Sequence, residues 1–144
     1  MQTITKIEII QEPAVLFAEG FETKDIPMDN YSYIDVVMVT GKGNKGPSTI
    51  TFEGRDGAAG EGKPLAFYKR NAEGSDFWGV GEEGDTFILG GEENATGRVI
   101  YRVHAQEMAT KQCDRFRIKG TAFAAWSGVQ TAIVGIYYKP RYTE

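Results

Sequence analysis

The chain has 144 residues, of which 41% are hydrophobic and 25% are charged, with a formal net charge of −4 at pH 7. This composition is typical of one globular domain with its own core, and it excludes a disordered or collagen-like chain. The single cysteine, Cys113, excludes an internal disulfide, and no apolar run approaches the ~18 residues of a membrane span. The first residues lack the apolar stretch of a signal peptide, so we expect synthesis in a cytoplasm and no membrane partner.

Charge is divided unevenly along the chain. Residues 1–97 carry 8 basic and 17 acidic residues, a net of −9, whereas residues 98–144 carry 8 basic and 3 acidic residues, a net of +5. Such an asymmetry steers association and sets orientation, so it predicts a surface that meets another surface. Nucleic acid is not expected as the partner, because the whole chain is acidic.

The first half of the chain contains both weak and strong strand patterns. Weak patterns occupy residues 3–10, 14–18 and 21–26. The almost wholly apolar run Ile34–Thr40 and the alternation around Ile50 and Phe52 are typical of central strands or of strands covered on both faces. Weaker alternation follows at residues 65–70 and 86–89.

The basic last third contains three clear strand patterns. In the first, alternate residues from Val99 to Ala105 face one side, and Arg98, Ile100, Arg102 and His104 face the other. In the second, Phe116 and Ile118 face inward while Arg115, Arg117 and Lys119 face outward. The third, Thr131–Lys139, is rich in β-branched and aromatic residues, again typical of a central or doubly covered strand.

Glycine-rich segments separate most of these runs. The chain has 18 glycines in 144 residues, a larger fraction than the ~7% of an average chain. About eight to ten short antiparallel strands at regular spacing predict an all-β fold, a jelly-roll-like β-sandwich. Helical turns are expected only at residues 29–33 and 107–112. We expect one domain over residues 1–144, with residues 1–25 as an N-terminal extension or arm.

No motif predicts catalysis, a cofactor or a metal site. Gly41–Gly46 matches G-x-G-x-x-G, but the alternating residues that follow predict a hairpin, not the helix that a phosphate site needs. His104 and Cys113 form a nucleophile pair only if the fold joins them. The acidic loops, with Glu82, Glu83 and Asp85 among their residues, lack the spacing of a calcium loop. They are predicted to be solvated turns, or the acidic counterpart of the basic strands on another copy of the chain.

Aromatic residues leave two binding roles open. Trp78 and Trp126, if exposed, would stack on sugar rings and make the protein a carbohydrate-binding module. Phe123 and Trp126 lie among small residues in the apolar loop Ala122–Gly128, which is typical of an interface hot spot. The predicted interface residues are therefore Arg98, Arg102, Arg115, Arg117, Lys119, Phe123 and Trp126.

The order of segments over residues 26–138 resembles the small β-sandwich structural proteins of tailed bacteriophages and prophages. Asp29 and Tyr33 form a D-x-x-x-Y pattern before the apolar strand, and the later strands carry Gly54-Arg55-Asp56-Gly57 and Tyr101-Arg102-Val103. The closing strand pair is Phe116–Gly120 and Ala132–Tyr138. The N-terminal extension and the apolar Ala122–Gly128 loop depart from the pattern.

This resemblance implies a non-enzymatic virion protein made in the cytoplasm of a bacterial host. The most specific form of the hypothesis is a decoration (cement) protein that binds capsid proteins and other copies of itself. A head-fibre, tail or neck component and a carbohydrate-binding module are the alternatives. No cofactor is expected.

Overall fold

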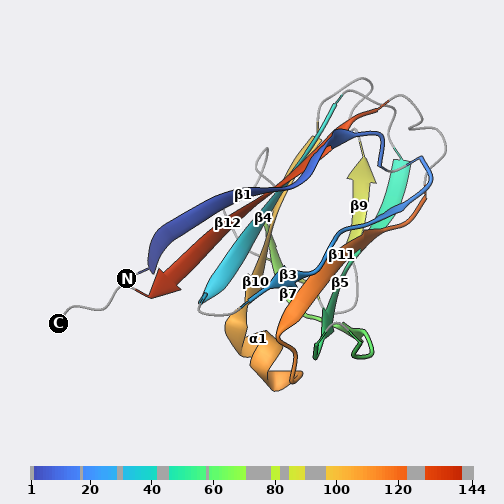
Figure 1. The fold of residues 1–144 in the computed structure, drawn as a ribbon. Coiled ribbons are helices and arrows are strands. Elements are labelled where there is room, and N and C mark those ends of the chain that lie inside the picture. The colour runs from blue at the N-terminus through green and yellow to red at the C-terminus, as the bar shows by residue number, and fades with distance from the viewer. Residues whose placement is uncertain are drawn as a thin grey trace.

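The computed structural model describes residues 2–16, 18–28, 31–41, 46–57, 59–70, 79–81, 85–89, 97–122 and 129–140. Two β-sheets and one short helix account for most of this part of the chain (Figure 1). Sheet A has the strand order β1-β12-β4-β10-β7-β8, and sheet B has the order β2-β11-β5-β6, with β3 also paired to β11 and β9 to β5. The all-β sandwich predicted from the sequence is confirmed.

The elements of sheet A are β1 (Gln2–Ala14), β4 (Tyr33–Thr40), β7 (Phe67–Arg70), β8 (Gly79–Gly81), β10 (Gly97–His104) and β12 (Thr131–Pro140). Those of sheet B are β2 (Phe21–Glu22), β3 (Ile26–Pro27), β5 (Gly46–Arg55), β6 (Lys63–Pro64), β9 (Asp85–Leu89) and β11 (Arg115–Gly120). Helix α1 (Ala105–Thr110) connects β10 to β11. All pairings between these strands are antiparallel, as expected.

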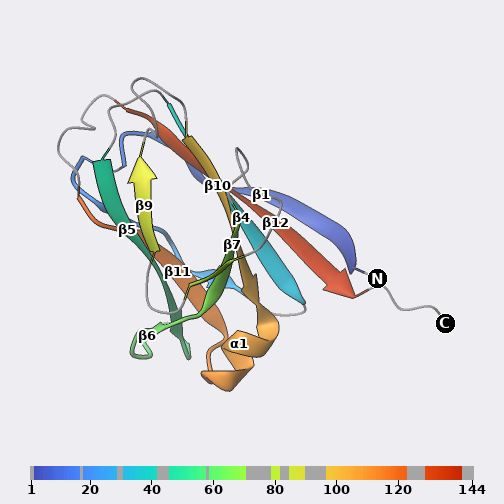
Figure 2. The ribbon, with the colours of Figure 1, turned by 180° about the vertical axis from the view of Figure 1, so that it is seen from behind.

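The connections give the sandwich a jelly-roll topology. The main strands run from β1 in sheet A to β2 and β3 in B, β4 in A, β5 and β9 in B, β10 in A, β11 in B and β12 in A. Each sheet therefore contains strands from both ends of the chain, and β6, β7 and β8 are inserted between β5 and β9. Figure 2 shows β7 beside β10, and the strand order of sheet A places β12, β4 and β10 between β1 and β7. This is the arrangement of two Greek keys wrapped into two sheets.

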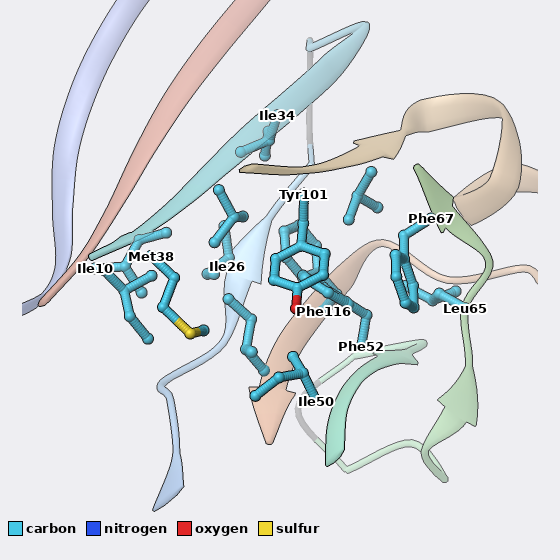
Figure 3. Close-up of a cluster of buried hydrophobic side chains, with 14 of the residues drawn as sticks. Ile10, Ile26, Ile34, Met38, Ile50, Phe52, Leu65, Phe67, Tyr101 and Phe116 are labelled. Carbon is cyan, nitrogen blue, oxygen red and sulfur yellow. The ribbon is translucent and has the colours of Figure 1, made fainter. Parts of the chain in front are cut away.

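The core lies between the two sheets and is built from alternate residues of the facing strands (Figure 3). Phe52 of β5 lies at its centre, with ring centroids 5.0 Å from Phe67, 5.2 Å from Tyr101 and 6.1 Å from Phe116. Offset and edge-to-face rings at these separations add to the stabilisation that burial provides. Other members include the inward residues of β4, which are Ile34, Val36 and Met38.

Strand β1 is longer and less regular than its pattern suggests. The sequence predicts separate strands at residues 3–10 and 14–18, whereas residues 2–14 form one strand along β12. The pairing register shifts between Ile4 and Lys6, between Ile9 and Gln11, and between Gln11 and Ala14. Each shift inserts a residue that breaks the two-residue alternation, so the apolar pattern reads as interrupted although the pairing continues.

The strand predicted at residues 21–26 is two short strands in the structure. Between them, the Thr23 amide donates to the Ile118 carbonyl over 2.9 Å, and the Thr23 hydroxyl accepts the Ile118 amide over 3.0 Å. A side chain thus replaces one ladder partner, which ends β2 and lets β3 resume the pairing with β11. The short strands β6 and β8 have no clear sequence signal, and helix α1 begins two residues before the helical turn predicted at 107–112.

Candidate interaction faces

The predicted basic residues of β11 lie on the outer face of sheet B, as their alternation indicates. Phe116 and Ile118 are buried in the core, and Arg115, Arg117 and Lys119 point away from it. They do not form a free positive patch, however. Arg117 contacts both Glu53 and Glu22, and Lys119 lies 2.9 Å from Glu53.

Two more ion pairs extend this arrangement towards the helix end of sheet B. Arg115 Nε donates to Asp114 Oδ1 over 3.0 Å, and Arg55 contacts Asp25. These four basic residues, Arg55, Arg115, Arg117 and Lys119, therefore contact four acidic ones, Glu22, Asp25, Glu53 and Asp114, and the net charge of these eight side chains is zero. Glu22, Glu53 and Asp25 come from β2, β5 and the loop after β2, in the acidic part of the sequence, whereas Asp114 directly precedes β11 in the basic part. These basic side chains therefore have acidic partners within one copy. Glu82 and Glu83, predicted as counterparts on another copy, lie outside the described residues.

Ion pairing also shows in the acidity of the carboxyl groups. Burial disfavours the charged form of Glu53, but hydrogen bonds from Lys119 and Arg117 outweigh it and lower the pKa of that carboxyl. Hydrogen bonds from Arg115 and from the Gly57 amide lower the pKa of Asp114 to about 2. Both carboxylates are consequently ionised at neutral pH and act as structural partners of the arginines.

The outer face of sheet A has a different character. Because directly opposed residues of antiparallel strands share a face, the pairing registers arrange its side chains in rows. One row runs Ile4, Tyr138, Tyr33, His104, and the next runs Ile7, Ile136, Asp35, Arg102, Tyr68. The third runs Ile9, Val134, Val37, Ile100, Arg70, and the fourth runs Ala132, Val39, Arg98. We call these rows the A face.

Much of the A face is apolar and reaches solvent. The side chains of β1 are the most open, with exposed fractions of 52% for Ile4, 66% for Ile7 and 57% for Ile9. Val39 of the central strand β4 is 45% exposed. Single exposed aliphatic residues are ordinary, but isoleucines and valines in adjacent rows across several strands form a contiguous patch.

One ion pair lies within the A face. Arg102 donates to Asp35 through Nε over 2.6 Å and through Nη2 over 2.9 Å, a two-point contact. The guanidinium carbon lies 4.0 Å from the centre of the Tyr33 ring, and Tyr138 stacks against Tyr33 with a centroid distance of 4.4 Å. Hydrogen bonding to Asp35 raises the pKa of Arg102, so the pair stays charged but mutually neutralised. Arg102 is thus paired with Asp35 of the same chain and lies beside the rings of Tyr33 and Tyr138.

His104 and Cys113 do not come together as a nucleophile pair. The His104 ring contacts Tyr33 and Tyr68 on the A face, with centroids 5.4 and 5.0 Å away. Cys113 Sγ donates to the Lys111 carbonyl over 3.4 Å, and the partly buried Cys113 side chain packs against the core. Burial lowers the pKa of His104 and raises that of Cys113, which favours a neutral imidazole and a protonated thiol.

A cavity of about 400 Å³ opens between β7, the end of β10 and helix α1. Tyr68, His104, Gln106 and Glu107 line it, while Cys113 is not among the described lining residues. Glu107 already accepts a hydrogen bond from the Ala66 amide over 3.3 Å. The cavity is therefore a recess beside the A face with mixed polar and apolar lining, and it does not bring the Cys113 thiol to the His104 imidazole.

Several predicted site residues fall beyond what the structure describes. Phe123 and Trp126 lie outside the described ranges, as do Trp78, Glu82 and Glu83. The register places Arg98 opposite Val39, on the side of sheet A predicted for it, but its side chain is not described. In the described part of the chain, no three His, Cys, Asp or Glu side chains are grouped so as to hold a metal ion, and no helix is long and apolar enough to span a membrane.

Sequence reasoning missed the A face as a site, although its signal was present. The almost wholly apolar run in β4 and the apolar character of β12 indicated coverage on both faces. Their outer residues Val37, Val39, Val134 and Ile136 belong to the A face, together with the isoleucines of β1. The β1 residues escaped notice because the register shifts place Ile4, Ile7 and Ile9 on one side at uneven spacing.

Comparisons with known proteins place the fold but not a family. The crystal structure of the SPBc2 prophage-derived protein YomS is similar to this chain, with a TM-score of 0.57 and 14% sequence identity. The likeness covers 96% of each chain, so it includes β1 and both sheets. No protein-family model matches the sequence, and no curated protein is significantly similar to it. The jelly-roll sandwich described here is therefore a fold that a prophage-derived protein also has, from end to end.

Proposed function

We propose that this protein is a non-enzymatic structural component of a phage or prophage particle, and that it decorates the capsid shell. The observation that carries the proposal is the A face, a broad apolar sheet surface on a sandwich whose core is already filled. A surface of this kind is typical of a subunit built for assembly. The fold shared with a prophage-derived protein supports the phage context.

The described side chains also favour a structural role over catalysis. The charged groups of the outer faces form ion pairs that hold strands together: Arg117 and Lys119 with Glu53, and Arg102 with Asp35. His104 and Cys113 occupy separate surroundings. Of the basic residues predicted for a docking patch, Arg102, Arg115, Arg117 and Lys119 thus form ion pairs within the sandwich.

The test is addition of the purified full-length protein to capsids assembled without it. We expect stoichiometric binding, measured by quantitative mass spectrometry of purified particles, and an increase in the temperature at which the capsids disrupt. Immunogold labelling of complete particles should place the protein on the head. Labelling confined to the tail or neck, or particles that contain no stoichiometric copy, would overturn the decoration role.

A further inference from the structure

We infer that the A face binds the A face of a second copy of this chain, in a two-fold symmetric contact between the outer surfaces of two A sheets. This inference does not rest on the proposed function, because it concerns the purified protein alone. It deepens that function by naming the partner of the apolar surface. In a decoration protein, the surface that meets the shell then lies elsewhere on the dimer.

The composition of the central strands is the first support. In β4, the inner residues Ile34, Val36 and Met38 are fully buried, while Val37 and Val39 are also apolar but belong to the A face. Strand β12 likewise has Ile133 in the core and Val134 and Ile136 on the A face. Strands that are apolar on both sides are typical of sheets covered on both sides. One cover is sheet B, and none of the elements that the structure describes is paired or packed as a second cover over the exposed Val39, Ile4, Ile7 and Ile9.

The distribution of charge favours a copy of the same chain as that cover. Within the rows of the A face, the charged side chains that the structure describes are Asp35 and Arg102, which neutralise each other. The register also places Arg98 and Arg70 in two of the rows, and their side chains lie outside the described part of the structure. A two-fold contact places each patch against itself, and any unbalanced charge would meet its like. The described charges of the A face are already paired, so this part of the face avoids that repulsion.

The size of the A face also fits a dimer. Four strands spaced ~4.8 Å apart, with about eight residues each at ~3.3 Å per residue, span roughly 19 by 26 Å. That is about 500 Å² in projection, of the same order as the ~800 Å² of accessible surface that each partner buries in a stable complex. The protruding isoleucines Ile4, Ile7 and Ile9 add to the accessible area. Two such twisted sheets pack face to face in the same way as the two sheets of a sandwich.

The experiment measures the mass of the full-length protein by sedimentation equilibrium over a range of concentrations. Ile7→Glu in β1 and Val39→Glu in β4 each place a charge on the A face at a position that is already exposed in one copy, so the fold tolerates them. Thr51→Glu is the matched control, because it adds the same charge on the outer face of sheet B, opposite Lys119. Circular dichroism melting curves confirm that all four proteins are folded.

We expect the unchanged protein to dimerise, and each A-face variant to weaken the dimer about 30-fold or more, as loss of an interface hot spot does. Thr51→Glu should dimerise like the unchanged protein. A monomer at about 100 μM, well above the Kd of a typical stable contact, would overturn the inference. So would a dimer that resists both A-face variants, or one that Thr51→Glu weakens equally. Capsid binding by a protein that remains monomeric would overturn the inference and leave the proposed function standing.

Discussion

Asp35 and Arg102 lie directly opposite each other on β4 and β10, and the guanidinium donates two hydrogen bonds to a carboxylate that is 6% exposed. Tyr33 and Tyr138 lie beside the Arg102 guanidinium on the A face. Removing Arg102 leaves the buried Asp35 carboxylate without its arginine. The contribution of each side chain to stability, and so to holding β4 and β10 together, therefore depends on the presence of the other.

A double-mutant cycle tests this coupling. We expect Arg102→Met to lower the free energy of unfolding by about 3 kcal/mol, because it leaves the buried Asp35 carboxylate without the arginine that pairs with it. Asp35→Val together with Arg102→Met should cost clearly less than the sum of the two single changes, since apolar residues fill the same space. Urea unfolding at one fixed protein concentration measures all four proteins. Additive single changes would show that the two side chains do not depend on each other.

Glu53 should make the stability depend on pH. Its pKa is lowered in the folded protein from an ordinary value of 4.5, so its ion pairs stabilise the fold above pH 4.5. That contribution is lost as the pH falls through the folded-state pKa, below 4.5. Glu53→Gln should cost about 1 kcal/mol at pH 7, and its difference from the unchanged protein should shrink in acid. Urea titrations from pH 7 to 3 provide the measurement.

The control for that experiment is Glu61→Gln, which removes the same formal charge from an exposed residue. Its difference from the unchanged protein should stay nearly constant over the same pH range. If Glu53→Gln and Glu61→Gln behave alike, the Arg117 and Lys119 contacts contribute nothing specific to stability.

Thr23 should be needed for its hydroxyl group. The hydroxyl accepts the buried amide of Ile118, so Thr23→Val leaves that amide without an acceptor while preserving the shape of the side chain. We expect a loss of about 1–3 kcal/mol, the cost of an unsatisfied buried donor. Thr23→Ser keeps the acceptor and should lose much less. Amide hydrogen exchange at Ile118 should accelerate in the valine variant and not in the serine variant.

Gly54 should tolerate no side chain. A Cβ atom at this position would lie 2.9 Å from both Cys113 Sγ and Leu65 Cδ2. Gly54→Ala should therefore destabilise the protein by about 1–3 kcal/mol through overpacking. Adding Cys113→Ala removes one of the two clashing atoms and should restore part of that loss. Thermal melting of the two single variants and the double variant will show whether the double variant recovers.

The strand assignments that the sequence predicted correctly come from local alternation. Phe116 and Ile118 are buried and Arg117 is outside because successive side chains of a strand point to opposite faces, whatever the strand pairs with. The same rule placed Val99, Tyr101 and Val103 in the core. The sandwich class followed from many such strands separated by glycine-rich segments. These features depend on residues close together in the chain, so the sequence determined them without knowledge of the partners.

Tertiary structure alone decided what the outer faces carry. The basic stripe of β11 lost its apparent charge because Glu22 and Glu53, distant in the sequence, lie beside it in sheet B. Ile4, Ile7 and Ile9 joined one apolar face because register shifts against β12 rotated them to the same side. Pairing and register arise from contacts between residues far apart in the chain. Periodicity shows which residues face outward, and only the neighbouring strands decide whether that surface is charged, neutral or apolar.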